Sequence, residues 1–462
     1  MKASCFKPVL LSSVVALSCA LVSHAANAKV SNEEASKLGT SLTCLGAEKT
    51  ASKDGQIPAF GGEWKGVPPG VDYKGSGSHF PNPFADEKPV LTITAQNMDQ
   101  YSDKLSEGLK ALLKKYPDTM RVPVYKTHRD FGYPDWFCEN AKQNALNSVL
   151  ANDGEGIDAT TGTVPFPIPQ SGLELYWNMN NTWGPWTMQK TVDQAVVYSN
   201  GSVVWGRTQM SCLSPRTDPK KRTTTVGGVN SYCYVETQLP ERDAGTAIIA
   251  TDYFNYDTQP RDAYQYNPGT RRVRQLPSFG FDMPQGPGGF RTVDDDQLFN
   301  GSPERYDWKI VGKKEMYVPY NNYMIDLPST KYDDLLKTKG VPNPDYMRYE
   351  LHRVWVLEAT LKNGYRHQYA KRDIYIDEDT WAPLMSDEYD NHQQLWRVAM
   401  VDWINIFRDG RIMPAAQLYH DLQSGAYLVD AVFGQQRKGP VIDQGDMSAS
   451  DFTPDALRRK GQ

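Results

Sequence analysis

Residues 348–361 read RYELHRVWVLEATL, a stretch in which apolar and polar side chains alternate. Successive side chains of a β-strand point to opposite faces of the sheet, so the pattern predicts a strand with one apolar and one polar face. The apolar set is Tyr349, Leu351, Trp355, Leu357 and Leu361, and the polar set is Glu350, His352, Glu358 and Thr360. We therefore expect the first face to meet an apolar interior and the second to meet water.

Turn signals around this strand predict an antiparallel sheet. Asn200-Gly201, Asn363-Gly364 and Asp409-Gly410 each stand between two strand-like runs, and such pairs favour the tight turns of β-hairpins. Residues 245–257 and 395–407 are apolar on both faces over part of their length, so another layer should cover them. A large sheet of this kind must curl into a barrel or be covered on its apolar face.

The region before the sheet is richer in Gly and Pro and contains helical pieces. We expect helices over residues 31–39, with Ser31 as the cap, over 94–118, which is the longest, and over 133–146. Prolines 165, 167 and 169 mark a boundary. The predicted organisation is a loop-rich region, 29–170, packed on a curved β-sheet, 171–462, as one compact domain.

The first 28 residues resemble a cleaved secretory signal peptide. Lys2 and Lys7 precede the apolar run VLLSSVVALSCALV, and an A-x-A site ends at Ala28. A lipoprotein alternative with Cys19 acylated is disfavoured, because the apolar run continues past Cys19. No later run reaches the roughly 18 apolar residues of a spanning helix. Cleavage changes the net charge from −5 to −5 − 2 = −7, which disfavours nucleic acid as a partner.

Four cysteines remain after cleavage, an even number that predicts disulfides in an oxidising compartment. Three pairings are open, and we favour Cys212 with Cys233, which flank a polar loop, and Cys44 with Cys138. A metal site is the alternative, but the cysteines lack the short spacing that zinc sites use.

Familiar catalytic motifs are absent from the sequence. There is no G-x-S-x-G turn, no H-E-x-x-H pair and no glycine-rich nucleotide loop, so we predict no catalytic residue, cofactor or metal. The acidic runs 294–296 and 377–379 do not follow the calcium-loop pattern, and we interpret them as turns and solvated strand ends. A carboxylate pair for glycoside cleavage stays open, because separation in space decides it.

Several blocks of the chain resemble the domain-of-unknown-function family DUF1329. They include MRVPVYKTHRDFGYPDWFCENAKQNA, YNPGTRRVRQLPSFGFD and DFTPDALRRKG, and the resemblance extends from Leu42 to Lys460. It implies a periplasmic, Gram-negative protein with a fold similar to the lipoprotein-sorting proteins LolA and LolB. That fold is a strongly curved, incomplete antiparallel β-barrel with covering helices. The resemblance also implies a resistance-nodulation-division type exporter and an outer-membrane protein as partners.

Three functions are compared on this basis. The leading hypothesis is a periplasmic carrier or chaperone that binds a lipid or other hydrophobic ligand inside the curved sheet and moves it between membranes. Its candidate wall residues are Tyr349, Leu351, Trp355, Leu357, Ile248, Phe254, Trp396, Val398 and Met400. The second is a non-catalytic adaptor between an exporter and the outer membrane, and the third is a hydrolase.

The stretch YQYNPGTRRVRQLPSF, residues 264–279, predicts a hairpin that turns at Asn267-Pro268-Gly269. In the returning strand Arg272 and Arg274 share a face, because side chains two residues apart point the same way. Two guanidinium groups suit a phosphate, a carboxylate head group or an acidic partner surface. We therefore add Arg272 and Arg274 to the candidate ligand-binding residues.

Overall fold

The computed structural model describes residues 1, 30–159, 161–222, 228–277 and 279–461. The predicted signal peptide, residues 1–28, lies outside the described residues except for Met1. Within the described chain, no helix has the length and apolar character needed to cross a membrane.

One large sheet of 16 strands forms the body of the protein. Its strands are β1 (Leu91–Ile93), β2 (Val122–Val124), β5 (Thr187–Val197), β6 (Val203–Leu213), β7 (Val229–Leu239), β8 (Ala247–Tyr253), β9 (Asp262–Asn267), β10 (Arg272–Gln275), β13 (Tyr306–Pro319), β14 (Tyr349–Leu361), β15 (Lys371–Asp377), β16 (Pro383–Tyr389), β17 (Leu395–Asn405), β18 (Ile412–Asp421), β19 (Tyr427–Val432) and β20 (Val441–Ile442). Two small sheets pair β3 (Val149–Ala151) with β4 (Gly156–Asp158) and β11 (Pro284–Gln285) with β12 (Arg291–Thr292).

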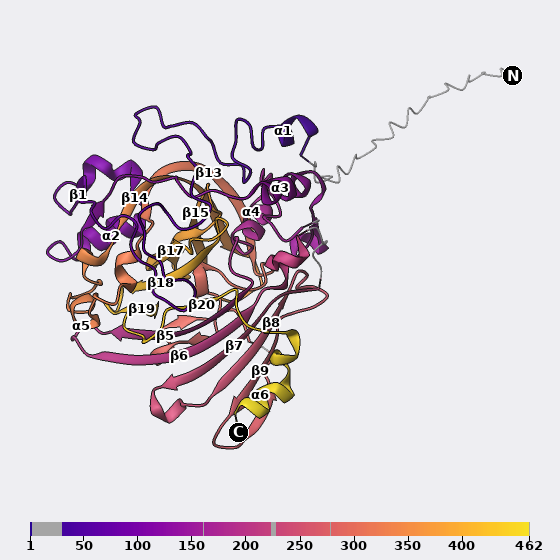
Figure 1. Ribbon diagram of the computed structural model, residues 1–462, viewed down its shortest axis with the longest axis vertical. Helices are drawn as coiled ribbons and strands as arrows, with labels where there is room; N and C mark the ends of the chain where they lie inside the picture. Colours follow the sequence, from indigo (N-terminus) through magenta and orange to yellow (C-terminus); the bar gives the residue numbers. More distant parts are fainter. Residues whose placement is uncertain (2–29, 160, 223–227, 278, 462) are drawn as a thin grey trace.

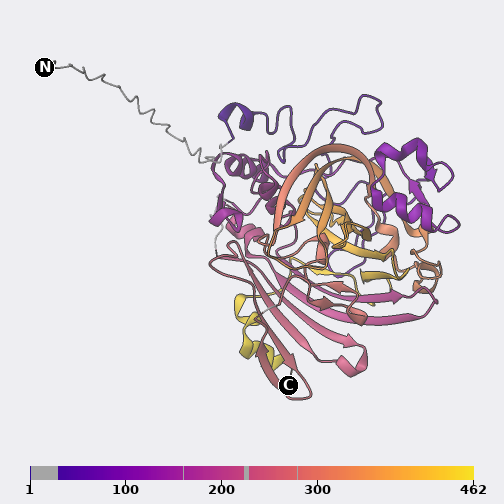
Figure 2. The ribbon, with the colours of Figure 1, turned by 180° about the vertical axis from the view of Figure 1, so that it is seen from behind.

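The large sheet is strongly curved and does not close. Its strand order is β1-β2-β14-β15-β16-β17-β18-β19-β5-β6-β7-β8-β9-β10, so β1 and β10 are its two ends, while β13 pairs with β14 and β20 with β5. In Figures 1 and 2 the long strands β5 to β8 form one broad layer, and the arched strands β13 to β15 rise away from it. The predicted fold, a mainly β protein with an incomplete, strongly curved antiparallel barrel, is confirmed, and one pair in the sheet, β2 with β14, is parallel.

All three predicted antiparallel strand pairs are confirmed, although the connection at Asn363-Gly364 is a longer loop, 362–370, and not a tight turn. The Asn-Gly turn at 200–201 joins β5 to β6, which pair antiparallel from Val197↔Val203 to Thr187↔Leu213. The other two turns join β14 to β15 and β17 to β18, again in antiparallel register. These local signals therefore set the order of neighbouring strands over much of the sheet.

The polar face of β14 departs from the prediction. Glu350 and His352 are almost fully buried, at 0% and 1% exposed, because residues 125–130 lie across them. The backbone N–H of His128 donates to Glu350 Oε2 at 2.9 Å, and Thr127 Oγ1 donates to the carbonyl of Leu351 at 2.9 Å. The expectation that this face meets water is wrong at its start, whereas Thr360 at its end is exposed.

The helices are short and lie around the sheet: α1 (Asn32–Ser36), α2 (Glu107–Lys115), α3 (Asp135–Asn147), α4 (Gly172–Met179), α5 (Tyr332–Leu335) and α6 (Pro454–Lys460). Ser31 caps α1 as predicted. The long helix expected over 94–118 is wrong, because it divides into a 3-10 helix, Met98–Lys104, and α2. Leu105 is extended and Ser106 starts a new helix by accepting from the N–H of Leu109, so α3 is the longest described helix.

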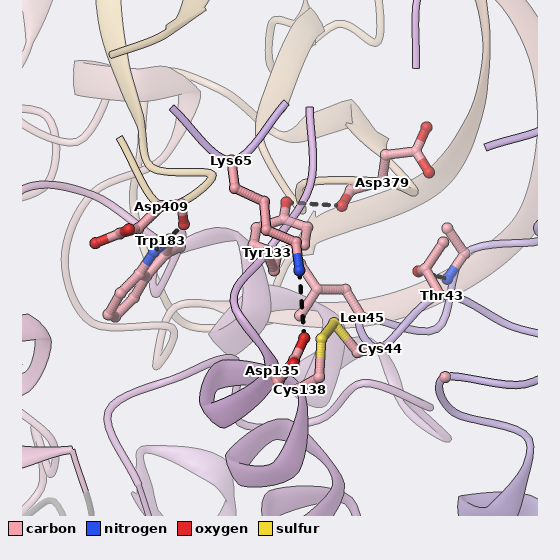
Figure 3. The surroundings of a disulfide bond; sticks show 12 residues. Thr43, Cys44, Leu45, Lys65, Tyr133, Asp135, Cys138, Trp183, Asp379 and Asp409 are labelled. Atoms are coloured by element: carbon pink, nitrogen blue, oxygen red, sulfur yellow. Dashed lines mark hydrogen bonds and ion pairs between the residues drawn. A yellow bond between two sulfur atoms is a disulfide. The ribbon is translucent and has the colours of Figure 1, made fainter. Parts of the chain in front are cut away.

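Both disulfides that we favoured are present. Cys212 bonds to Cys233 across the adjacent strands β6 and β7. Cys44 bonds to Cys138 in α3 and ties the N-terminal segment to that helix, as Figure 3 shows. Tyr133 and Asp379 lie nearby, where the Tyr133 hydroxyl donates to the carbonyl of Asp379 at 3.1 Å. This bridge therefore fixes the segment around Cys44 beside the turn that joins β15 to β16.

A buried acid in β17 is predicted to make stability depend on pH. Burial raises the pKa of Asp402 to about 8, although Asn322 donates to it at 2.9 Å. The folded protein then keeps a proton that the unfolded chain releases near pH 4. The free energy of unfolding should therefore fall, by about 1.4 kcal/mol per pH unit, as pH rises between about 4 and 8.

Asp402→Asn removes this proton exchange. The free energy of unfolding of the variant should exceed that of the unmodified protein by a margin that grows across the same pH range. Urea denaturation of both proteins at several pH values measures the margin. If the difference in free energy of unfolding between the two proteins stays constant from about pH 4 to 8, the Asp402 carboxyl of the folded protein is ionised across that range.

Candidate functional site

A groove of about 780 Å³ lies on the inner face of strands β5 to β8. Every second residue of these strands lines it, as alternation in a sheet requires. Its apolar lining is Met188, Val192, Val204, Met210, Val235, Leu239, Ile248 and Ala250. The volume is within the range of about 300 to 1,000 Å³ that is typical of small-molecule sites.

The outer face of β7, β8 and β9 is packed against the C-terminal helical segment. Tyr234 of β7, Ile249 of β8 and Tyr266 of β9 are buried there against Phe452 and Leu457 of the C-terminal helical segment. Figure 1 shows α6 beside β8 and β9. At β7 to β9 the outer face of the sheet is therefore covered, whereas the inner face borders the groove.

A flap, defined as residues 283–289, covers part of the groove. Its sequence, MPQGPGG, includes glycines at 286 and 288 with positive φ, a conformation that other residues rarely adopt. Pro287 rests on Gly206 of β6, where an added Cβ would lie 2.7 Å from Pro287 Cγ. A glycine inside a strand often marks such a close approach, so Gly206 provides the seat for the flap.

The floor of the groove carries four charged groups. Arg291 Nε donates to Asp430 Oδ2 at 2.7 Å, and Arg291 Nη2 lies 3.7 Å from Asp296 Oδ1. Lys190 of β5 is 6% exposed, and its Nζ donates to the carbonyl oxygen of Pro414 at 3.2 Å. Burial lowers the pKa of the Lys190 ammonium, and the nearby carboxylates Asp326, Asp296 and Asp430 oppose that shift.

The arginines of the 264–279 hairpin lie at the outer edge of the groove. In β10, Arg272 is opposite Asn267 and Arg274 is opposite Gln265, and both partners line the groove. Cross-strand neighbours point to the same face, so the two arginines are on the groove side of the edge strand. Both are exposed, and neither has an ion pair with any described residue.

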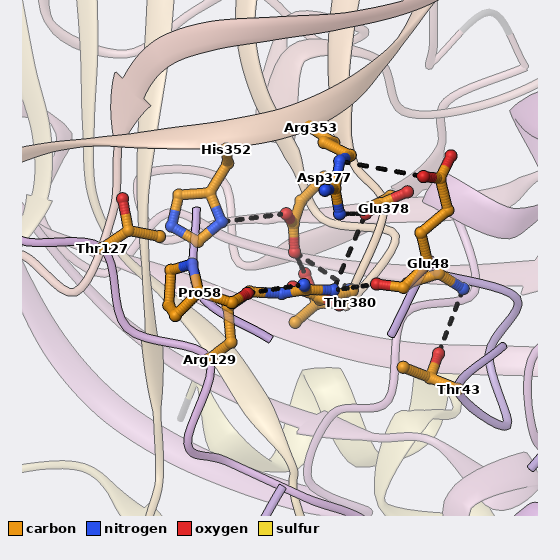
Figure 4. Close-up of polar contacts among 12 residues, drawn as sticks. Thr43, Glu48, Pro58, Thr127, Arg129, His352, Arg353, Asp377, Glu378 and Thr380 are labelled. Atoms are coloured by element: carbon orange, nitrogen blue, oxygen red, sulfur yellow. Dashed lines mark hydrogen bonds and ion pairs between the residues drawn. The ribbon is translucent and has the colours of Figure 1, made fainter. Parts of the chain in front are cut away.

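A second polar cluster lies away from the groove, between the N-terminal segment and strands β14 and β15 (Figure 4). His352 Nδ1 is 3.7 Å from Asp377 Oδ1, and Arg129 donates to both oxygens of Asp379 at 2.7 and 2.8 Å. Burial, and to a lesser extent the carboxylate of Asp379, raises the pKa of Asp377 to about 6.

His352, Asp377 and Asp379 offer ligand atoms within 4.8 Å of one another, a spacing that suits a metal ion. The guanidinium of Arg129 already engages both oxygens of Asp379, and a cation there would have to displace it. Arg129 also donates to the carbonyl oxygens of Pro58 and Glu48 at 3.0 and 2.7 Å. We therefore interpret the cluster as an ion-pair network that fastens residues 48–58 to the sheet.

The acidic runs lie at turns and at a strand end as predicted, but the expectation that they are solvated is wrong for all but Asp296, which is partly exposed. Asp294 and Asp295 are at most 1% exposed, and each has an oxygen 3.1 Å from Arg372 Nη2. The second run, 377–379, is buried in the network around Arg129. Arginines from distant segments compensate these carboxylates, and that compensation is not visible in a local sequence pattern.

Of the predicted wall residues, Ile248 alone lines the groove. Packed core contains Tyr349, Leu351, Leu357, Phe254, Val398 and Met400, while Trp355 and Trp396 are partly buried outside the groove. Tyr349, for example, is 3% exposed, and its hydroxyl contacts the sulfur of Met400. Strand alternation identified apolar faces, but it did not distinguish a face that is packed from one that lines a space.

Sequence reasoning missed Lys190, Thr208 and the flap. Two signals point to them: a glycine within the strand-like run at Gly206, and the Gly- and Pro-rich segment 284–289. Together they indicate a backbone that is approached closely by a loop.

The fold and the groove define a mainly β protein whose open, curved sheet holds a ligand-sized groove under a flap. The chain belongs to the DUF1329 family, described as proteins of unknown function, whose model matches residues 92–458. A Pseudomonas aeruginosa protein described as uncharacterized is 43% identical over 460 residues, which are 98% of this chain and 99% of that protein. The family resemblance noted in the sequence is confirmed.

Several solved structures are similar to the chain at lower sequence identity. An outer membrane lipoprotein-sorting protein domain from Vibrio parahaemolyticus has 15% identity and a TM-score of 0.44, and it covers 62% of this chain and 98% of its own. A DUF1329 family protein from Desulfovibrio piger has 17% identity and a TM-score of 0.41, with 62% and 97% covered. A LolA superfamily protein from Nitrosomonas europaea has 15% identity and a TM-score of 0.36, with 62% and 100% covered. Because these TM-scores are low, the family assignment rests on the family model and the Pseudomonas relative.

Proposed function

We propose that this protein is a periplasmic carrier that holds a lipid-like or other hydrophobic ligand in the groove of β5 to β8. The observation that carries the proposal is the groove itself, with half-buried apolar side chains on the inner face of four strands and a glycine-rich flap over them. Half-buried apolar walls around a space of this size suit an apolar ligand better than water.

Simple energetics agree with such a ligand. Each methylene buried contributes about 0.8 kcal/mol, so about ten methylenes supply about 8 kcal/mol before the cost of ordering the chain. The described residues that line the groove include no histidine and no serine, and the cysteine among them, Cys233, is bonded to Cys212. These features support a binding role without a reaction.

The predicted signal peptide and the two disulfides support the periplasm as the location, because disulfides persist in oxidising compartments. The direct test is mass spectrometry of the organic extract of protein purified from a bacterial periplasm. We expect an amphipathic compound in stoichiometric amount. An extract without one, together with no uptake of a neutral apolar fluorophore such as N-phenylnaphthylamine, would contradict the carrier function.

The exposed arginine edge should help the protein to dock where the ligand is transferred. We expect Arg272→Ala with Arg274→Ala to leave the melting temperature unchanged, since both side chains are exposed without ion pairs. Its affinity for phosphatidylglycerol vesicles should fall by up to about thirtyfold, because each arginine near an anionic surface contributes about 1 kcal/mol.

Arg271→Ala is the matched control, because Arg271 lies in the turn, before the strand begins. Vesicle sedimentation measures the affinities, and vesicles of phosphatidylcholine give the uncharged reference. If the double variant unfolds, the arginines are structural; if all three proteins bind equally, the edge has no docking role.

The same edge favours a second candidate function, an adaptor that links an inner-membrane exporter to the outer membrane. Crosslinking in cells distinguishes the two functions. An adaptor keeps its protein partner when the groove is blocked, for example by Thr208→Trp. A carrier loses transfer of its ligand under the same change.

A further inference from the structure

Lys190 carries a buried ammonium group in the groove. Its side chain is buried at the floor of the groove, and Nζ donates one hydrogen bond, to the carbonyl oxygen of Pro414 at 3.2 Å. An ammonium group has three N–H donors, and no carboxylate of any described residue lies within 4.0 Å of this one. Burying a charge without a charged partner is costly, so Lys190 lowers the stability of the folded protein unless a bound group pairs with it.

The acids around Lys190 are engaged with other groups. Asp430 accepts from Arg291 Nε and from Gln194 Nε2, each at 2.7 Å. Asp296 accepts from Gln417 Nε2 at 3.0 Å and lies 3.7 Å from Arg291.

A third acid, Asp326, is buried and does not line the groove. It accepts from the backbone N–H groups of Phe433 and Gly434 at 2.7 and 3.1 Å. Its other oxygen, Oδ2, has no hydrogen-bond partner among the described residues and acts on Lys190 only from beyond 4.0 Å. Lys190 is therefore a cation at the floor that no described carboxylate contacts, with the ring of Phe433 6.0 Å from its Nζ.

We propose that the groove is selective for amphiphiles with an anionic head group, a carboxylate or a phosphate, and that Lys190 pairs with that head group. This inference rests on the proposed carrier function and adds the chemical class of its ligand. The apolar side chains of Val192 and Ile248 line the same space, so a head group at Lys190 leaves room for the attached chain between the walls. A carboxylate or phosphate accepts charge-assisted hydrogen bonds from an ammonium, which a hydroxyl head group does less well.

The test compares ligands that share one chain and differ in the head group. Dodecanoate, dodecyl phosphate and dodecanol are each used to displace N-phenylnaphthylamine, which carries no charge. With the unmodified protein, the two anions should displace the fluorophore at about tenfold lower concentration than the alcohol, the size expected for one charge-assisted hydrogen bond. Inorganic phosphate and acetate should not displace it, and displacement by either would show that a free anion is the ligand.

Lys190→Met keeps an unbranched side chain that is one atom shorter and removes its charge. The preference for either anion over the alcohol should fall to about one, whereas Lys190→Arg should retain part of it. Lys309→Met, at an exposed position on β13 outside the groove, is the matched control and should keep the full preference. Near-ultraviolet circular dichroism confirms folding, and Lys190→Gln replaces the methionine variant if that one does not fold.

The outcomes separate this inference from the carrier function. Equal affinity for anion and alcohol in the unmodified protein, or an undiminished preference after Lys190→Met, overturns the role of Lys190 while apolar binding still stands. Failure of the fluorophore and of all three amphiphiles to bind overturns the carrier function itself.

Discussion

Replacing Thr208 with tryptophan is expected to lower the affinity of the protein for an apolar ligand by about fiftyfold. Thr208 lies in the middle of β6, faces the groove and is paired with Val192 of β5. An indole at this point occupies the space of about three methylenes of a bound chain, each contributing about 0.8 kcal/mol. A loss of about 2.4 kcal/mol corresponds to that change in affinity.

Gln209→Trp is the control for this variant. Gln209 is the next residue of the same strand, is exposed and points to the opposite face, so the added indole does not enter the groove. Titration of both variants with N-phenylnaphthylamine gives the affinities, and thermal unfolding shows whether each is folded. Equal affinities of the two folded variants would place the ligand elsewhere.

Arg129→Met should cause the largest loss of stability, with the free energy of unfolding reduced by about 3 to 5 kcal/mol. The Arg129 side chain is 1% exposed and supplies the guanidinium that pairs with Asp379 and lies 3.7 Å from Glu378. Removing it leaves a buried carboxylate without its cation, and it also removes the hydrogen bonds that hold Pro58 and Glu48. Urea denaturation with both disulfides intact measures the loss.

Two comparisons make this prediction specific. Lys65→Met breaks an ion pair whose members, Lys65 and Asp135, are 51% and 93% exposed (Figure 3), and it should cost less than about 1 kcal/mol. Adding Asp379→Asn to Arg129→Met should recover part of the stability, because the unpaired charge is then gone. A loss below about 1 kcal/mol for Arg129→Met would show that the network of Figure 4 is solvated in solution.

The sequence predicted some residues beside the groove correctly and placed others there that lie in packed core. The hairpin at 264–279 places Arg272 and Arg274 on one face of an edge strand, and the structure places that face beside the groove. Leu351 has an equally clear apolar pattern, yet it is 2% exposed in packed core. A tryptophan at 351 would therefore disrupt the core, whereas one at Thr208 fills the groove.

The sequence by itself determined the elements that depend on near neighbours. Alternation identified β14, Asn-Gly and Asp-Gly pairs located three hairpins, and the even number of cysteines indicated disulfides, of which the favoured pairing is the one observed. Family blocks identified DUF1329. The strand and the hairpins follow from backbone preferences and local geometry, which a short stretch of chain carries within itself.

Only the tertiary structure decided what each face meets. Alternation states which side chains share a face, but the layer that covers that face comes from residues tens or hundreds of positions away. The segment 125–130 buries Glu350 and His352, and arginines from other segments pair with both acidic runs. In the part of the chain that the structure describes, the space inside β5 to β8 stays open beside the flap. The groove and its lysine are therefore properties of the assembled sheet, because burial and empty space depend on contacts between distant parts of the chain.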